Sequence, residues 1–247
     1  MAVLFVTGTS TDVGKTVVTA AVAALALSRG ARVAVVKPGQ TGVGPSEPGD
    51  LAAVASLSGA CDLHELVRYP SALSPAAAAR VDRLAPLDPV ALYDLVLSLD
   101  HDLVLVEGAG GLLVRFDEDG TTLADFARGL RAEVLVVAGP YLGTLNHTAL
   151  TLEALAHRGV SLAGIVLGSW PASPGLAERA NLRDLETLAA RPLLGALPAG
   201  SGALSTAHFL SVARASLGPQ LGGEWDARAF RQRWDCGSAG SGFVNGH

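Results

Sequence analysis

A stretch near the N-terminus combines the residue types that hold phosphate groups. Residues 3–16 read VLFVTGTSTDVGKT, an apolar strand followed by a glycine-bearing turn and then Gly-Lys-Thr at the start of a helix. Backbone N–H groups of such a turn bind phosphate oxygens, while Lys15 supplies a positive charge and Thr16 a hydroxyl for Mg²⁺. The usual spacing would place glycine at residue 9, whereas this chain has Gly8 followed by Thr9. The strand before and the helix after still favour a nucleoside triphosphate site over a fortuitous turn.

A second lysine lies where another apolar run ends. Lys37 is found in VVKPGQTG, where Pro38 and Gly39 predict a sharp turn directly after it. An exposed lysine at a strand end is common. However, two lysines at adjacent strand ends can bracket a phosphoryl group in transfer, where charge stabilisation is most of the catalysis. The residues alone leave both interpretations of Lys37 open, and a catalytic pair of Lys15 and Lys37 is one of them.

Two carboxylates stand in comparable positions. Glu107 ends the apolar run of LVLVEGAGGLL, and the small residues 108–111 after it let the backbone approach a ligand closely. Such a carboxylate can be merely solvated or paired with a lysine, but beside a phosphate loop we predict a Mg²⁺ ligand. Asp50 follows Gly49 and precedes the helical run LAAVASL. From the residues alone, it is equally well interpreted as an N-cap of that helix or as a ligand.

A glycine-containing turn in GPYLGTLNHT opens a further helix. Its residues Gly143, Thr144 and Leu145 carry the free N–H groups of a helix start, which favour an anion such as a carboxylate. Asn146 and His147 follow directly. Their setting indicates binding rather than catalysis, and His147 can equally be packed into the helix, so we predict no catalytic role for it.

These groups need a scaffold, and the pattern of apolar runs predicts one. The predicted strands are Val3–Thr7, Arg32–Lys37, Leu103–Glu107, Val134–Ala138, Leu162–Leu167 and Leu193–Ala196. The predicted helices are Lys15–Arg29, Asp50–Leu57, Pro89–Leu99, Leu145–Arg158, Gly175–Ala190 and Thr206–Leu217. Continuous apolar strands are buried on both faces, so we predict a doubly wound, mostly parallel α/β sheet with helices on both faces, of the P-loop NTPase type. Ligands of such sheets bind beyond the carboxyl ends of the strands, where the polar groups above gather.

Length and composition predict one domain with an extension. The chain has 247 residues, of which 1–221 are expected to form a single P-loop synthetase domain. In the C-terminal extension, 222–247, Glu224–Trp234 could form a short amphipathic helix, and the glycine- and serine-rich segment 236–247 is expected to be a flexible tail. The preferred interpretation of this extension is a solvated terminus without function.

Charge and cysteine content exclude several partners. There are 18 basic and 23 acidic residues, a net charge of −5, and no dense basic run, which argues against nucleic acid and against a membrane as partners. Cys61 and Cys236 lie far apart, and two reduced thiols are the preferred interpretation. Because only Met1 and Ala2 precede the first predicted strand and no apolar run approaches ~20 residues, we expect no signal peptide, no membrane span and a cytoplasmic location.

Four segments in order resemble one family. GTSTDVGKT, VVKPGQTG, VEGAGGLL and LGTLNHT are similar to the ATP-dependent dethiobiotin synthetases of biotin biosynthesis, in which the spacing at Gly8 is itself a feature. The resemblance extends from Ala2 to about Leu217. It implies a ligase of the cytoplasm, active as a homodimer, that joins 7,8-diaminopelargonate and CO₂ to form the ureido ring of dethiobiotin. ATP or another nucleoside triphosphate would drive the reaction with Mg²⁺, through a carbamic-phosphoric anhydride.

The resemblance also implies site residues. The triphosphate would be bound by Asp12, Val13, Gly14, Lys15, Thr16, Val17, Asp50, Glu107, Gly108, Ala109 and Gly110. The Mg²⁺ ligands would be Thr16, Asp50 and Glu107, which favours the ligand interpretation of Asp50. The substrate would contact Thr41, then Ser74 and Pro75 in the loop SALSPAAAA, and the turn of Gly143, Thr144, Leu145 and Asn146 in the opposite subunit of the homodimer. Lys37 would be the catalytic lysine.

One segment departs from the family pattern. After the fifth predicted strand the family usually carries an asparagine that reads the adenine edge, whereas this chain has Gly168 and Ser169. We expect backbone groups there to hold the base, together with Pro198, Ala199 and Gly200. Base discrimination should then be weak, because rejection of a wrong base depends on leaving buried polar groups unpaired.

Three other functions compete with this interpretation. An amidating synthetase of the same fold usually carries an attached glutaminase domain, for which this chain has no room. A nucleotide-switched positioning ATPase carries an extra lysine in its phosphate loop, where this chain has Ser10. A regulatory nucleotide-binding module without turnover is the third. Formation of dethiobiotin separates all of them from a synthetase.

Overall fold

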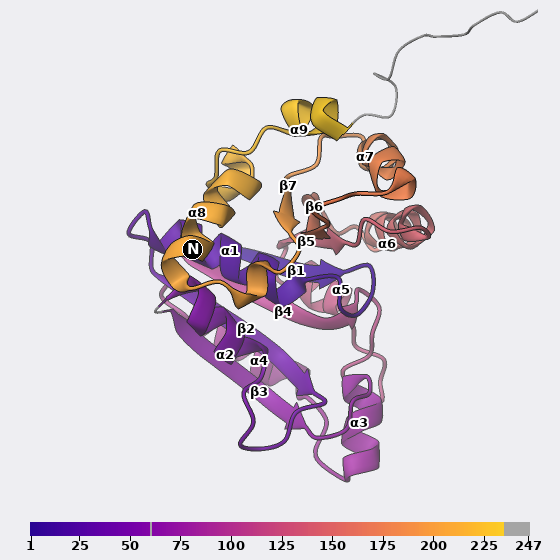
Figure 1. The fold of residues 1–247 in the computed structure, drawn as a ribbon. Helices are drawn as coiled ribbons and strands as arrows, with labels where there is room; N and C mark the ends of the chain where they lie inside the picture. The colour runs from indigo at the N-terminus through magenta and orange to yellow at the C-terminus, as the bar shows by residue number, and fades with distance from the viewer. Residues whose placement is uncertain (60, 235–247) are drawn as a thin grey trace, which may run out of the picture.

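The core of the protein is a seven-stranded sheet in which every neighbouring pair of strands is parallel. The computed structural model describes residues 1–59 and 61–234, and within them the strand order is β3-β2-β4-β1-β5-β6-β7. The strands are β1 (Ala2–Gly8), β2 (Val33–Thr41), β3 (Asp62–Tyr69), β4 (Leu103–Gly111), β5 (Glu133–Ala138), β6 (Leu162–Trp170) and β7 (Gly195–Pro198). Figure 1 shows this sheet running through the molecule with helices on either side.

Helices cover both faces of the sheet. They are α1 (Lys15–Leu27), α2 (Asp50–Ser58), α3 (Pro75–Asp82), α4 (Pro89–Ser98), α5 (Leu123–Gly129), α6 (Thr144–His157), α7 (Leu176–Ala189), α8 (Thr206–Ser216) and α9 (Ala227–Trp234). Side chains of α1, α2 and α8 pack with Val35 on one face, and side chains of α4, α5, α6 and α7 pack with Val36 on the other. Successive residues of a strand point to opposite faces, so a continuous apolar strand supplies both layers. The predicted doubly wound α/β fold is confirmed.

Each predicted strand and helix is present, with ends that differ by a few residues. The structure also contains β3, α3 and α5, which the sequence did not predict. The strand β3 has the sequence DLHELVRY, whose charged residues interrupt the apolar run, and it lies at the edge of the sheet. The segment SALSPAAAA, expected to be a loop, instead starts helix α3, with Ser74 at the N-cap and Pro75 in the first turn. Proline suits that position because its missing N–H would be unpaired there.

The expected sharp turn after Lys37 is wrong. Strand β2 continues through Pro38 to Thr41, paired with β3 at Lys37–Glu65 and again at Gly39–Val67. Its pairing with β4 ends at Val36, one residue before Lys37. Proline cannot donate to a ladder, and it is tolerated here because β2 and β4 have already separated. Lys37 therefore lies in the middle of β2, at the point where the gap between β2 and β4 opens.

The C-terminal extension packs onto the domain as far as it is described. We expected a solvated terminus from Gly222, but Trp225 is buried and Phe230 and Trp234 pack against the core. The expected amphipathic helix is present as α9, and it starts three residues later than Glu224. The glycine- and serine-rich tail, 236–247, lies outside the described residues, as does Cys236, while Cys61 is a free thiol.

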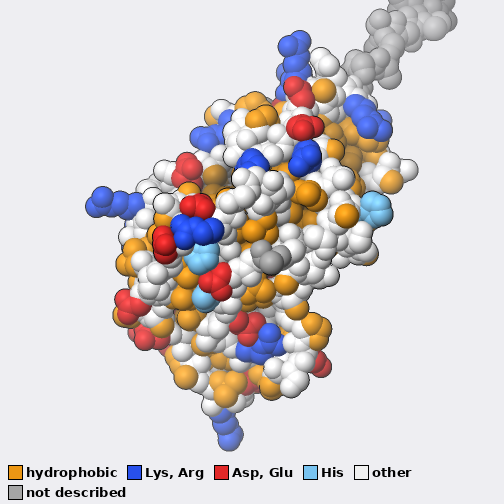
Figure 2. Space-filling view, turned by 90° about the vertical axis from the view of Figure 1, so that its left-hand side faces the viewer, with side chains coloured by type: hydrophobic (Ala, Val, Ile, Leu, Met, Phe, Trp, Pro, Cys, Tyr) orange, Lys and Arg blue, Asp and Glu red, His pale blue; other side chains and the backbone are white. Residues whose placement is uncertain are grey.

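The surface shows no segregation of charge in the view of Figure 2, where acidic and basic side chains are interspersed. None of the described helices combines the length and the apolar character needed to cross a membrane.

Candidate active site

A pocket of about 480 Å³ lies at the carboxyl ends of β1, β2 and β4. The phosphate loop before α1 forms one wall and the two strand ends form the other. Its lining residues are Thr11, Asp12, Gly14, Lys15, Thr16, Val17, Lys37, Gly39, Gln40, Thr41, Val43, Asp50, Glu107, Ala109 and Gly110. The structure thus brings together both predicted catalytic lysines, all three predicted metal ligands and Thr41. These are also the only two lysines in the whole sequence.

The phosphate loop has the backbone geometry of an anion-binding turn. Asp12 and Gly14 have positive φ angles of 56° and 96°, which bends the loop before α1 begins at Lys15. Gly8 explains the unusual spacing, because a Cβ there would lie 2.5 Å from the carbonyl oxygen of Ser10. The tight approach of strand and loop therefore requires glycine at residue 8.

Lys15 folds back over this loop. Its Nζ donates to the carbonyl oxygen of Ser10 at 3.1 Å. Burial, and then the neighbouring charge of Lys37, lower the pKa of Lys15. An incoming phosphate group would offset both effects, because it supplies negative charge where two ammonium groups repel each other.

Lys37 lies among carboxylates at the centre of the pocket. Its Nζ is 2.8 Å from Oε1 of Glu107 and 3.2 Å from the carbonyl oxygen of Gly108, and it forms an ion pair with Asp50. Lys37 is 2% exposed and Glu107 is fully buried. Burial by itself would lower the pKa of Lys37, but the charges of Glu107 and Asp50 outweigh it and raise that pKa. Lys37 is consequently a cation at neutral pH rather than a base.

The oxygen atoms beside Lys37 suit a hard divalent cation. Thr16 donates its hydroxyl to Oε1 of Glu107 at 2.9 Å, while the buried Oε2 of Glu107 has no hydrogen-bond partner among the described residues. Carboxylate and hydroxyl oxygens are the ligands that Mg²⁺ prefers, and Mg²⁺ commonly shares its coordination with substrate phosphates. Within residues 1–59 and 61–234, no group of three or more His, Cys, Asp or Glu could hold a metal ion. A cation bound here would therefore depend on the triphosphate for some of its ligands.

Asp50 is held in place by residues for which the sequence alone indicates no role. The buried Gln40 accepts a hydrogen bond from the backbone N–H of Asp50 at 2.8 Å and so caps helix α2 from strand β2. Arg68 of β3 donates to the carbonyl oxygens of Gly44 and Glu47, at 3.0 and 2.6 Å, and so holds the loop before α2. The motif VVKPGQTG contains Gln40, but the role of Arg68 depends on β3, which the sequence did not reveal.

Comparisons with known proteins place this chain in a family. A family model described as an AAA domain matches residues 2–202. The chain is 62% identical over 237 residues to the ATP-dependent dethiobiotin synthetase BioD of Frankia casuarinae, which covers 95% of this chain and 100% of the relative. It is 56% identical over 235 residues to the protein of the same name from Streptomyces coelicolor, with 94% and 99% covered. The chain belongs to the dethiobiotin synthetase family.

Solved structures of lower identity support the fold alone. The septum site-determining protein MinD from Pyrococcus horikoshii, complexed with Mg-ADP, aligns with a TM-score of 0.53 at 16% identity, over 90% of this chain and 94% of that one. A ParA family ATPase from Chlorobium tepidum aligns with the same TM-score at 18% identity and the same coverage. The dethiobiotin synthetase domain described here therefore has the fold of P-loop ATPases.

The predicted base-binding residues of this dethiobiotin synthetase family member lie outside the pocket. Gly168 is packed against the phosphate loop, where a Cβ would lie 2.0 Å from the carbonyl oxygen of Val13. Pro198 and Ala199 border a different cavity, along the outer edge of β7. Val13 itself is buried beneath the loop.

The predicted substrate-binding residues are distributed around the same edge of the sheet. Pro75 lies beside the pocket, because a Cβ on Gly39 would be 3.4 Å from its side chain. The turn of residues 143–146 forms the N-terminus of α6, with Gly143 at a φ of 95°, and none of its residues lines the pocket. Within this chain, Thr41 is the predicted substrate contact that the pocket includes.

Proposed function

We propose that this pocket closes the ureido ring of dethiobiotin from 7,8-diaminopelargonate and CO₂, driven by ATP. The observation that carries the proposal is the buried ammonium group of Lys37, held 2.8 Å from Glu107 and opposite Lys15 of the phosphate loop. Two fixed cations at the place where a γ-phosphoryl group would lie stabilise charge that develops during transfer, which is most of the catalysis in phosphoryl chemistry.

The reaction proceeds in three steps. One amine of the substrate adds to CO₂, loses a proton and forms a carbamate. An oxygen of that carbamate attacks the γ-phosphorus of ATP, ADP leaves, and a carbamic-phosphoric anhydride results. The second amine then attacks the carbamate carbon and loses a proton, the bond from that carbon to the phosphorylated oxygen breaks, phosphate leaves with this oxygen, and the ring closes. Lys15 and Lys37 neutralise charge on the phosphoryl group and the carbamate. Because both amines belong to one molecule, closure is intramolecular, an advantage of up to about 7–11 kcal/mol.

Thr16, Asp50 and Glu107 are the residues that would hold Mg²⁺. The Oε2 of Glu107, which has no hydrogen-bond partner within residues 1–59 and 61–234, and the hydroxyl of Thr16 would supply hard oxygen ligands for it. When bound, the ion neutralises negative charge on the triphosphate. Lys37 pairs with Glu107 and Asp50 in this structure. A cation that enters the pocket would therefore contact carboxylate groups that also contact the ammonium group of Lys37.

The substrate's carboxylate tail is assigned to residues 143–146 of a second subunit. Thr144 donates its N–H to the carbonyl oxygen of Tyr141 at 3.2 Å, and the remaining N–H groups at the start of α6 favour an anion. Exposed apolar side chains lie directly before this turn, in α6 and in the segment after β4. Leu142 is 85% exposed, and Leu113, Tyr141 and Leu150 are also exposed. Apolar side chains that cluster on a surface mark an interaction site, which supports a homodimer here. A crystal structure with 7,8-diaminopelargonate tests whether the tail contacts the second copy.

Formation of dethiobiotin is the direct test of this proposal. Incubation with 7,8-diaminopelargonate, bicarbonate, Mg²⁺ and ATP is expected to give dethiobiotin by mass spectrometry, with one phosphate released per product. Phosphate release that ignores the diamine would instead indicate a nucleotide-switched ATPase. Nucleotide binding with no turnover would indicate a regulatory module, and incorporation of ammonia into a carboxylate an amidating synthetase.

Base selectivity is expected to be weak. Glycine at residue 168 offers no side chain to read the base. If backbone groups hold the base instead, a wrong base leaves few buried polar groups without a hydrogen-bond partner, so it is rejected only weakly. We therefore expect CTP, GTP and UTP to compete with ATP within about tenfold, measured by competition binding with one labelled triphosphate. An exclusive preference for ATP would contradict this expectation.

A further inference from the structure

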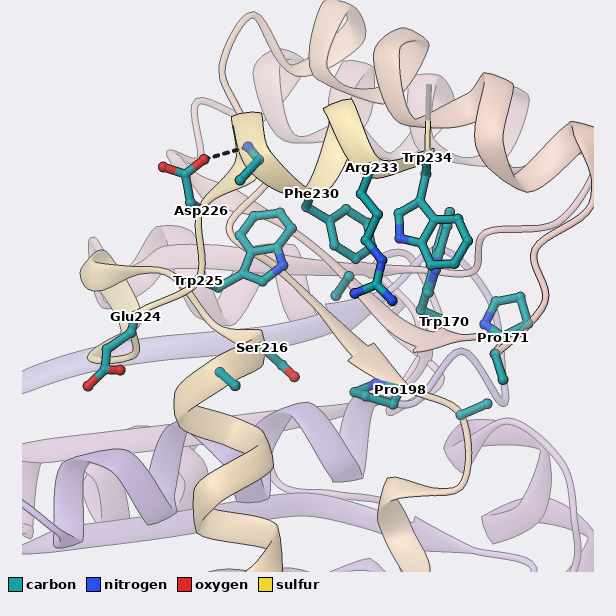
Figure 3. Close-up of a pocket in the computed structure, with 15 residues that line it drawn as sticks. Trp170, Pro171, Pro198, Ser216, Glu224, Trp225, Asp226, Phe230, Arg233 and Trp234 are labelled. Carbon is teal, nitrogen blue, oxygen red and sulfur yellow. Dashed lines mark hydrogen bonds between the residues drawn. The ribbon is translucent and has the colours of Figure 1, made fainter. Parts of the chain in front are cut away.

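A second cavity lies along the outer edge of β7, between helices α8 and α9. Its volume is about 640 Å³, and it shares no lining residue with the active-site pocket. All three tryptophans of the chain, Trp170, Trp225 and Trp234, line it. Figure 3 shows their rings with that of Phe230 forming the upper wall under α9, while Pro198 and the end of α8 form the floor.

The aromatic wall is tightly packed. Trp170 and Trp225 each contact Phe230 with ring centroids 5.2 Å apart, and Trp170 lies 6.0 Å from Trp234. These tilted and edge-to-face arrangements are the preferred geometries of aromatic pairs. Trp170 is 6% exposed and Trp225 is 9% exposed. The wall is therefore a preformed apolar surface, ready to bury an apolar ligand without the cost of ordering loops.

Unpaired hydrogen-bond donors accompany this wall. The indole nitrogens of Trp170, Trp225 and Trp234 are buried and have no hydrogen-bond partner in the described part of the chain. An indole N–H can only donate. A buried donor without an acceptor costs about 1–3 kcal/mol, and these nitrogens lie below the surface of the cavity wall, so the polar recognition of a ligand depends on Arg233.

The charge at the cavity points in the same direction. Arg233 reaches between the tryptophan rings in Figure 3, with its Cζ 5.0 Å from the ring centroid of Trp234, and it has no ion pair among the described residues. The two carboxylates at the rim, those of Asp226 and Glu224, do not point toward the rings. Asp226 accepts a hydrogen bond from the N–H of Ala229 at 2.6 Å, and Glu224 extends away from the rings. The charged group that the cavity lining offers to a ligand is therefore the guanidinium of the exposed Arg233.

We propose that this cavity binds an organic monocarboxylate with an apolar body. The rings of Trp170, Trp225 and Phe230 would cover the body, and the carboxylate would accept hydrogen bonds from Arg233. Charge-assisted bonds to guanidinium are about twice as strong as neutral ones and match the planar carboxylate. Pro198 and Ala199, which we expect to hold the base of the triphosphate, border this cavity, but a nucleobase fits the aromatic wall and Arg233 less well, because it presents donors as well as acceptors and carries no charge.

Intrinsic fluorescence reports on this cavity selectively, because every tryptophan of the chain lines it. Titration with nonanoate, and separately with dethiobiotin, is expected to give a saturable change in tryptophan emission. Nonan-1-ol has the same chain without the charge, and it should bind at least tenfold more weakly than nonanoate. Lys15→Ala should leave the carboxylate response unchanged, since Lys15 lies in the other pocket.

Variants of α9 separate binding from structure. Arg233→Ala should weaken nonanoate binding at least tenfold, whereas Arg233→Lys should keep it within a fewfold. Arg228→Ala is the matched control, because Arg228 is an exposed arginine of the same helix that does not line the cavity, and it should change nothing. Far-ultraviolet circular dichroism and Tm verify that each variant is folded.

Three outcomes would overturn the proposal. The first is the absence of a saturable response to either carboxylate. The second is an equal response to nonanoate in the Arg233→Ala variant and in the unaltered protein. The third is a response to ATP alone that Lys15→Ala abolishes, which would assign the cavity to the nucleotide. None of these outcomes bears on dethiobiotin formation, so the synthetase proposal is tested independently.

Discussion

Replacing Lys37 by alanine is expected to lower kcat for dethiobiotin formation on the order of 10³-fold or more, the effect of losing a cation that stabilises phosphoryl transfer. The dissociation constant of ATP should change only a fewfold, because Lys15 and the loop backbone still hold the phosphates. Steady-state assays of product by mass and calorimetric titration with a non-hydrolysable ATP analogue measure the two quantities. A near-normal kcat in this variant would show that Lys37 is not catalytic.

The Lys37→Ala variant also needs a check of its folding. Removal of Lys37 leaves the fully buried Glu107 without its cation, and breaking a buried ion pair costs about 3–5 kcal/mol. Tm should therefore fall, and it should recover in part when Mg²⁺ and ATP are added. Arg32→Ala is a suitable control, because this exposed arginine precedes β2 at the opposite edge of the sheet. It removes one positive charge and should leave kcat unchanged.

The sequence was sufficient to predict the central part of the fold. Buried parallel strands are continuous apolar runs, and β1, β4 and β5 satisfy this pattern without exception over residues 3–6, 103–106 and 134–138. Strand β3 lies at the edge of the sheet and carries Asp62, Glu65 and Arg68. Because an edge strand is only partly buried, its sequence alternates and resembles a loop. The strand that the sequence did not predict, β3, is thus a strand with little burial.

The functional groups of the site were predictable, but their supports were not. Lys37 and Glu107 end apolar runs and Lys15 follows a glycine-bearing turn, so their residue types and positions indicate their chemistry. Gln40 and Arg68 act through Asp50, because Gln40 caps the backbone at the start of α2 and Arg68 holds the loop before that helix. Nothing in their local sequence reveals these roles. Such contacts depend on the order of strands in the sheet, which brings β3 beside β2. Positioning residues therefore became visible only with the structure.

The geometry around Gly168 changes what its departure from the family pattern means. Strand β6 and the phosphate loop touch at this residue, since a Cβ on Gly168 would lie 2.0 Å from the carbonyl oxygen of Val13 and 2.7 Å from Cγ1 of Val137. The contact is reciprocal, because a Cβ on Gly14 would lie 2.6 Å from the carbonyl oxygen of Gly168. Glycine here fixes the position of the loop, in addition to leaving the base without a side-chain reader.

Installing the family's usual residue with Gly168→Asn is therefore expected to impair nucleotide binding rather than to create a preference for ATP. Overpacking of this kind costs typically about 1–3 kcal/mol. If the phosphate loop moves to make room for the asparagine side chain, the affinity for triphosphates falls about ten- to a hundredfold, whichever base they carry. Ser169→Ala, which keeps the backbone, should bind all triphosphates as the unaltered protein does. Calorimetric titrations with ATP and CTP measure both variants. Tighter ATP binding by Gly168→Asn, with CTP unchanged, would mean that the loop accommodates the side chain and that Gly168 sets base selectivity alone.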